Sequence, residues 1–253
     1  MPNGGDRRFV LLTGAAGRIG TAFRGVTGER YRFRLADRTL EGLDQTPGEG
    51  HEVLPLDVAD AEACQQACLG IDTVIHLAAD PSPEADFYGS LLENNIKGTY
   101  NVFRAAKDAG CRRVIFASSI HAVIGYPPRT QPRPSDAGKP LNMYGVSKCF
   151  GEAMAACFAA NGMSSIAVRI GAYEAPWIAA EPTPENVSIF VSARDLNQLL
   201  GLCVEVADVP FAVVHGVSDN RFGRLDLSAT KELLGYAPED DGFQFYGDLF
   251  AER

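Results

Sequence analysis

The chain has 253 residues, and its 32 acidic side chains against 23 basic ones give it a formal net charge of −9. Hydrophobic residues make up 46% and charged residues 22%, which is the composition of an ordinary globular protein with one large domain, or one domain with a small appendage. Because the balance is acidic and the basic residues are scattered, the sequence gives no reason to expect a polyanion-binding surface, and we expect no nucleic-acid partner.

Short apolar segments alternate with helical patterns along the first two-thirds of the chain. The predicted strands, in chain order, are 8–12, 31–37, a stretch within 51–58, 72–79, 112–119 and 164–171. Helices are predicted between them, through Phe23 and Val26, at 61–70, from 87 to 109 and from about 143 to 161. Strands of nearly continuous apolar character joined by helices indicate an α/β fold, with a parallel sheet covered on both faces.

Beyond residue 171 this alternation stops. The segment EAPWIAAEPTPENVS, at 174–188, has the composition of a loop, as does the proline-rich and glycine-rich stretch at 125–141. A helix near 193–206, a strand at 210–215 and a tail with one more helix follow. We therefore expect 172–253 to form a small cap that packs on residues 1–171 within a single structural unit.

The N-terminal stretch MPNGGDRRFVLLTG is too short in apolar length for a secretory signal peptide, and no apolar run approaches the ~18 residues of a membrane span. The six cysteines form no CxxC pattern and the four histidines are dispersed. Reduced, mostly buried thiols and the absence of a metal site are the expected outcome. These features predict a cytoplasmic protein without a membrane partner.

Three glycines, Gly14, Gly17 and Gly20, lie directly between the first predicted strand and the first predicted helix. In an open α/β sheet this turn is where a pyrophosphate binds, because glycine lets the backbone approach the phosphates and the helix N-terminus offers unpaired N–H groups. The spacing is GxxGxxG, which differs from the more familiar GxGxxG. With a strand before it and a helix after it, the motif predicts dinucleotide binding.

Acidic and small residues follow the next strands. A carboxylate at Asp37 can accept hydrogen bonds from both ribose hydroxyls of an adenosine and would repel a 2′-phosphate, which favours NAD over NADP. Arg38 and Arg18 are close enough in sequence to pair with a phosphate instead. Asp57 is placed to reach the adenine edge, and the small residues at 78 and 79 would let a cofactor lie close over the sheet.

Tyr144 and Lys148 are four residues apart in the stretch MYGVSKC, so both lie on one face of a helix. A titratable phenol beside a fixed positive charge is a possible acid–base site. The same spacing is common on solvated helix faces, and the pair alone does not decide between the two.

Taken together, the motifs TGAAGRIG, LDVAD, HLAA, NNIKGTYNV, FASS and YGVSK, with Asp37, resemble the extended branch of the short-chain dehydrogenase/reductase family, the NAD-dependent epimerase/dehydratases. The resemblance covers residues 8–171. It implies a Rossmann fold, a doubly wound parallel sheet in which 1–171 bind NAD and 172–253 form a small substrate-binding cap. The stretches FASSIHAVIGYP and YGVSKCFGE look most like uronate dehydrogenases and related NAD-dependent sugar dehydrogenases, including a glucose-6-phosphate-oxidising group.

The resemblance assigns roles to three catalytic residues. Tyr144 is the general acid/base that takes the proton of a substrate hydroxyl while hydride passes to NAD. Lys148 lowers the pKa of this phenol, as does the oxidised nicotinamide, and it also binds the nicotinamide ribose. Ser119 holds the reacting oxygen.

Further contacts follow from the same alignment of motifs. The implied cofactor-binding residues are Gly14, Gly17, Arg18, Ile19, Gly20, Asp37, Arg38, Asp57, Val58, Leu77, Ala78, Ala79, Asn95, Tyr144, Lys148 and Ile170. The substrate contacts are Ser82, Ser119, His121, Tyr144 and Arg194. Ser82 could instead be a residue of a proline-flanked turn that does not contact substrate. Arg194 could instead be a residue at the start of a helix, within a capping box formed by Ser192 and Asp195. A homodimer through the helix at 87–109 and the helix of Tyr144 is also implied.

The chain departs from the uronate dehydrogenases at three polar positions. It has no lysine or arginine between Arg169 and Arg194, where that family places the cation that binds the substrate carboxylate. Ala172 replaces an expected serine, and Ile120 replaces an expected asparagine. An unpaired carboxylate in a closed site costs several kcal/mol. The sequence therefore leaves three candidate substrates: a uronate, a neutral aldose and a phosphosugar.

The predicted activity is NAD-dependent oxidation of a sugar-like alcohol, in its leading form C1 oxidation of a cyclic aldose or uronate to the lactone. A nucleotide-sugar epimerase or dehydratase is the alternative within the family. Only about 80 residues follow the sixth strand, which leaves little room for a nucleotide pocket. A non-catalytic NAD-sensing protein is the alternative outside the family. This class is disfavoured because the chain has the complete catalytic set of Ser119, Tyr144 and Lys148.

Overall fold

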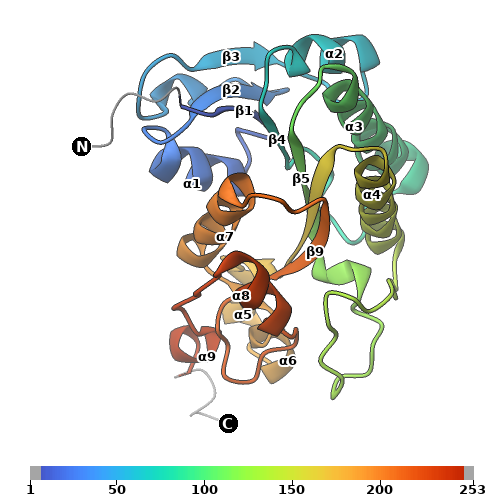
Figure 1. The fold of residues 1–253 in the computed structure, drawn as a ribbon. Helices are drawn as coiled ribbons and strands as arrows, with labels where there is room; N and C mark the ends of the chain where they lie inside the picture. Colours follow the sequence, from blue (N-terminus) through green and yellow to red (C-terminus); the bar gives the residue numbers. More distant parts are fainter. Residues whose placement is uncertain (1–6, 248–253) are drawn as a thin grey trace.

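The apolar segments of the sequence form a seven-stranded parallel sheet in the order β3-β2-β1-β4-β5-β6-β9 (Figure 1). The computed structural model describes residues 7–247. The strands are β1 (Phe9–Thr13), β2 (Arg32–Asp37), β3 (Glu52–Pro55), β4 (Thr73–His76), β5 (Arg113–Ser119), β6 (Ser164–Ile170) and β9 (Phe211–Gly216). The chain order reverses between β1 and β4, which is the switch point where α/β sheets bind ligands beyond the carboxyl ends of their strands.

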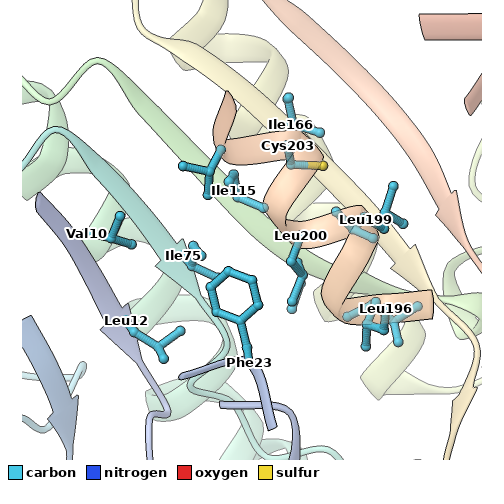
Figure 2. Packing of buried hydrophobic residues seen from close by; sticks show 14 of the residues in the cluster. Val10, Leu12, Phe23, Ile75, Ile115, Ile166, Leu196, Leu199, Leu200 and Cys203 are labelled. Carbon is cyan, nitrogen blue, oxygen red and sulfur yellow. The ribbon is translucent and has the colours of Figure 1, made fainter. Parts of the chain in front are cut away.

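Helices cover both faces of this sheet, as Figure 1 shows. On one face lie α1 (Arg18–Thr27) and α7 (Ala193–Glu205), and on the other α2 (Ala61–Cys68), α3 (Gly98–Asp108) and α4 (Met143–Ala160). Figure 2 shows the core on the first face, where Leu196, Leu199 and Leu200 of α7 pack toward side chains of the central strands. The predicted α/β architecture is thus confirmed, including its two helical layers.

The helix predicted over 87–109 is present, but its first half has a different hydrogen-bond pattern. Residues Phe87–Lys97 form a π-helix, η2, in which each N–H bonds the carbonyl five residues back, and α3 follows without a break. The Asp86 carboxylate caps the start by accepting a hydrogen bond from Gly89 N at 2.5 Å. The wider turn changes which side chains of this segment face the sheet.

The segment predicted as a loop after β6 contains short regular elements. They are β7 (Ala172–Tyr173), α5 (Trp177–Ala180), α6 (Pro184–Val187) and β8 (Phe190–Val191), and β7 pairs with β8 in a second small parallel sheet. The tail holds α8 (Ser228–Leu234) and α9 (Gly242–Phe245), one helix more than predicted. Two short 3₁₀ turns, η1 (Leu43–Gln45) and η3 (Ile120–Ala122), complete the described elements.

All six cysteines are free thiols, and four of them are buried. Within residues 7–247, no helix combines the length and the apolar character that crossing a bilayer demands. The N-terminal stretch that we judged too short for a signal peptide begins with residues 1–6, which lie outside the described part of the chain.

Candidate active site

A cavity of about 800 Å³ opens at the carboxyl ends of the strands, over the point where their order reverses. Thr13 of β1, Asp37 of β2, Ser119 of β5 and Ile170 of β6 all reach it from the last position of their strand. This volume is within the usual range for sites of cofactors and small molecules. The topology of the sheet therefore brings strand-end residues that are far apart in sequence to one site.

Most of the predicted site residues line this cavity. They are Gly14, Gly17, Arg18, Ile19, Gly20, Asp37, Arg38, Val58, Leu77, Ala78, Ala79, Ser119, His121, Tyr144, Lys148 and Ile170. Four predicted residues, Asp57, Ser82, Asn95 and Arg194, do not line it.

The glycine loop forms one wall and needs its glycines for steric reasons. Gly14 has φ +70°, and a Cβ on it would lie 2.7 Å from the backbone nitrogen of Ala78. A Cβ on Gly20 would lie 2.5 Å from the Gly14 carbonyl oxygen. Helix α1 begins next to this turn with Gly17 as its N-cap, so no side chain satisfies its first N–H groups. These features fit the pyrophosphate of a dinucleotide.

The carboxylate of Asp37 holds the glycine loop against the end of β2. Its Oδ2 accepts a hydrogen bond from Ala16 N at 2.9 Å, and its Oδ1 accepts one from Thr39 N at 3.2 Å. Two carboxylate oxygens offer about four acceptor sites, so capacity for ribose hydroxyls remains. The acid thus organises the loop and presents negative charge to the cavity.

We expect Asp37→Asn to weaken NAD binding and to lower the preference for NAD over NADP by at least about tenfold, a change equivalent to ~1.4 kcal/mol. The amide oxygen can still accept the Ala16 N–H, while the charge that repels a 2′-phosphate is gone. Titration of both cofactors by fluorescence measures the ratio. Glu41→Gln, on an exposed side chain just beyond β2, is the matched control. An unchanged ratio in Asp37→Asn would remove this carboxylate from cofactor selection.

The catalytic candidates meet at the β5 end of the cavity. Tyr144 lies in the first turn of α4 and is 8% exposed, and its ring centroid is 5.5 Å from that of His121. Lys148, one turn later, is fully enclosed and donates a hydrogen bond from Nζ to the Ala117 carbonyl at 2.8 Å. Its Nζ is 5.4 Å from the centroid of the Tyr144 ring. Tyr144 and Lys148 therefore lie on one face of α4, as predicted, and both side chains line the cavity.

We expected Lys148 to lower the pKa of the Tyr144 phenol, but the pKa of Tyr144 lies above its ordinary value. Burial raises the pKa of Tyr144 above its ordinary value, with hydrogen bonding to Ser119 opposing the effect and the charge of Asp80 adding to it. Burial also lowers the pKa of Lys148 to about 8. The net effect of the chain's own residues is thus to raise the pKa of Tyr144, with Ser119 acting against it, and the positive charge of an oxidised nicotinamide is the other lowering influence that we named.

Asp57 and Asn95 take structural positions beside the cavity. The exposed Asp57 accepts a hydrogen bond from Ala59 N at 2.9 Å and shapes the turn before α2. Asn95 is buried, accepts from Asp80 N at 2.8 Å and donates to Ser147 Oγ at 3.1 Å. Asn95 therefore ties the loop after β4 to α4, and it does not line the cavity where the resemblance implied a cofactor contact.

Arg194 and Ser82 were predicted to contact substrate, and the structure does not bring them to the cavity. The half-exposed Arg194 guanidinium forms ion pairs with Glu239 at 2.9 Å and Asp240 at 2.6 Å. Ser192 Oγ accepts from Asp195 N, so Ser192 is the N-cap of α7, as the alternative interpretation requires. The reciprocal bond of a capping box is not formed, because Ser192 N donates to Ser218 Oγ. Ser82 Oγ accepts a hydrogen bond from Glu84 N at 3.2 Å. This contact fits the alternative interpretation of Ser82 as a turn residue.

The cavity also has walls that the sequence analysis did not single out. The additional residues come from the segment after β4 and from the segment after β6, and they are Pro81, Pro83, Asn94, Tyr173, Trp177 and Ile189. Two aromatic residues soon after the sixth strand were an available signal, because exposed aromatic side chains often mark binding sites. Asn94 had no such signal, since its neighbour Asn95 matched the motif.

Comparisons with known proteins agree with this geometry. Residues 10–206 match the NAD dependent epimerase/dehydratase family. The chain is 37% identical over 251 residues to an NAD-dependent glucose-6-phosphate dehydrogenase of Haloferax volcanii, covering 93% of this chain and 95% of the relative. It is 33% identical over 247 residues to a uronate dehydrogenase of Pseudomonas syringae pv. tomato, covering 96% of this chain and 86% of the relative.

A third relative and a solved structure extend the comparison. An L-arabinose 1-dehydrogenase (NAD(P)(+)) of Haloferax volcanii is 33% identical over 255 residues, with 92% of this chain and 96% of the relative covered. A mutant uronate dehydrogenase from Agrobacterium tumefaciens, solved in complex with NAD, superposes with a TM-score of 0.82 at 31% identity. That superposition covers 97% of this chain and 89% of the other.

Proposed function

Because the chain belongs to the NAD-dependent epimerase/dehydratase family and is an NAD-dependent dehydrogenase of its extended branch, we propose that it oxidises C1 of a cyclic sugar to the lactone. Relatives that match nearly the whole chain are named for glucose 6-phosphate, uronate and L-arabinose. All three are sugars or sugar derivatives that can close into a ring with a hydroxyl on C1. This shared group is the part of the substrate that the proposal assigns.

One observation carries the proposal: Ser119, Tyr144 and Lys148 line the same cavity as the glycine loop and Asp37. Bound NAD supplies the hydride acceptor in this chemistry. In our mechanism the Tyr144 phenolate, favoured by the positive charge of oxidised NAD, would take the proton of the C1 hydroxyl as hydride leaves C1 for NAD, and it would become a phenol. The Ser119 hydroxyl would donate a hydrogen bond to the same C1 oxygen. Lys148, charged below its pKa of about 8, binds the nicotinamide ribose beneath the Tyr144 ring.

The test is a panel of aldoses, uronates and sugar phosphates incubated with the purified full chain and NAD. We expect the absorbance of reduced nicotinamide to grow with at least one sugar, and hydroxylamine to trap the lactone as a hydroxamate. The methyl glycoside of the active sugar is the matched control, because its C1 oxygen carries no proton to remove. Oxidation of the glycoside would move the chemistry to another carbon, and silence across the panel would remove the proposed activity.

A homodimer through the helices at 87–109 and 143–161 stays a prediction, as does the cytoplasmic location. Exposed apolar side chains on these helices, Tyr88, Tyr100 and Val146, support an interface there.

A further inference from the structure

The end of the cavity beside Tyr144 is where a sugar would meet the phenol, and its walls are neutral. The cavity wall includes Pro81, Pro83, Asn94, His121, Tyr173, Trp177 and Ile189, and the His121 ring contacts the ring of Tyr144. None of these side chains carries a fixed positive charge. A carboxylate or phosphate on the sugar would need a cation from elsewhere in the cavity.

Three cationic side chains line the cavity. Each of them either hydrogen-bonds another group of the protein or follows β2, away from β5. Lys148 donates to the Ala117 carbonyl beneath the Tyr144 ring. Arg38 follows the end of β2, which β1 and β4 separate from β5 in the sheet. Arg18 donates hydrogen bonds from Nη2 to the carbonyl oxygens of Tyr173 at 3.2 Å and Glu174 at 2.8 Å, and its guanidinium lies over the Tyr173 ring, 5.4 Å from the ring centroid. Arg18 is thus the one cation beside the aromatic wall among the described lining residues, and in our assignment it binds the cofactor as well as these two carbonyl groups.

His121 is a hydrogen-bond donor here and not a cation. The Asn142 side chain accepts from Gly145 N through Oδ1 at 2.8 Å, because Asn142 is the N-cap of α4. Its amide nitrogen therefore faces His121 Nδ1, at 3.1 Å, and can only donate to it. Nδ1 is the acceptor, so the proton of the neutral ring is on Nε2. Burial lowers the pKa of His121, which keeps the ring neutral near pH 7.

Asn94 offers the complementary acceptor. Its amide nitrogen donates to the Ser90 carbonyl at 3.1 Å and to Ser90 Oγ at 3.0 Å. None of the described residues donates to its Oδ1, and the side chain lies in the cavity wall. The Asp80 carboxylate, which accepts from Ser90 Oγ at 2.5 Å, adds negative charge on this side of the site. A hydroxyl group is suited to these partners, whereas an anion is not.

We infer that the sugar oxidised here is an uncharged cyclic aldose, recognised by the His121 Nε2–H donor, the Asn94 Oδ1 acceptor and the aromatic face of Trp177. The inference rests on the proposed function and names its substrate class. Aromatic rings suit the apolar face of a sugar ring, and the neutral donor and acceptor suit its hydroxyls. A uronate or a sugar phosphate would instead leave its charge unpaired in the site.

The decisive experiment measures kcat/KM for sugars that differ only in their charged group. The pairs are D-glucose with D-glucuronate, D-glucose with D-glucose 6-phosphate, and D-galactose with D-galacturonate, and L-arabinose is added as a pentose. We expect at least one neutral sugar to exceed its charged partner by about tenfold or more, the ratio that ~1.4 kcal/mol of discrimination produces. Equal or higher values for the charged partners overturn the inference and leave C1 oxidation standing. If no sugar reduces NAD, the proposed function fails and the inference fails with it.

Two variants test the named contacts. Asn94→Ala is expected to raise the KM of the preferred neutral sugar by up to about tenfold, as loss of one hydrogen bond to a hydroxyl does, without changing the KM of NAD. Glu93→Ala, on an exposed residue of the same helix, is its matched control. Trp177→Ala, at a half-exposed position on α5, should also raise that KM without disturbing the core. If neither variant raises it, these side chains do not contact the sugar and the inference is overturned.

Discussion

Replacing Tyr144 by phenylalanine will lower kcat by about 10²–10⁴-fold, the usual contribution of a general acid–base group, while NAD binding changes little. The substitution removes only the phenolic oxygen. The ring keeps its edge contact with His121 and its position over Lys148. Steady-state kinetics with the active sugar, together with a titration of NAD, separates loss of chemistry from loss of the cofactor site.

The matched control is Tyr126→Phe. Tyr126 donates from its hydroxyl to the Ala137 carbonyl at 3.1 Å in the 125–141 loop and does not line the cavity. We expect this variant to retain its kcat. If Tyr144→Phe keeps activity within tenfold of the native chain, a different group removes the proton and the assignment of Tyr144 is wrong.

Glu152→Ala will lower the free energy of unfolding by about 3–5 kcal/mol, because it leaves a buried charge without its partner. The Arg169 side chain is 2% exposed, and its guanidinium bonds both carboxylate oxygens of Glu152, at 2.8 and 2.9 Å. Ser118 Oγ donates to the same carboxylate at 2.6 Å and would lose its acceptor. Urea denaturation followed by circular dichroism measures the difference.

Two further variants serve as controls for the loss of stability in Glu152→Ala. Asp219→Ala breaks the exposed pair with Lys231 and should leave the urea midpoint nearly unchanged, since exposed pairs contribute little. The double variant Glu152→Met with Arg169→Met replaces both charges by apolar groups and should recover much of the loss. A loss below about 1 kcal/mol in Glu152→Ala would mean that solvent reaches this pair.

Sequence patterns predicted the sheet because each strand carries its own local signal. Apolar runs, and a period-two alternation at 31–37, identified the seven strands of the large sheet, and the right-handed connection of parallel strands leaves few ways to order them. The same logic predicted the cavity. Gly14, Asp37 and Ser119 follow three different strands, and parallel strands end at one edge of the sheet.

The misplaced residues depended on contacts that local sequence does not encode. Arg194 is held outside the cavity by Glu239 and Asp240, more than forty positions away in sequence. Asn94 faces the cavity and Asn95 is buried in a π-helix, whose wider turn is not visible in an apolar pattern of period 3.6. The short strands β7 and β8 have two residues each, which is below the length at which alternation can be recognised.

The hydrogen bond from Ala16 N to Asp37 has a consequence for how such a chain can change over evolution. The carboxylate that supports the glycine turn is, in our assignment, also the one that selects the adenosine ribose. A descendant that lost this acid to accept a phosphorylated coenzyme would also have to supply a new acceptor for that amide. The route to a different coenzyme therefore requires paired changes, with Asn as the one-step intermediate that preserves the turn.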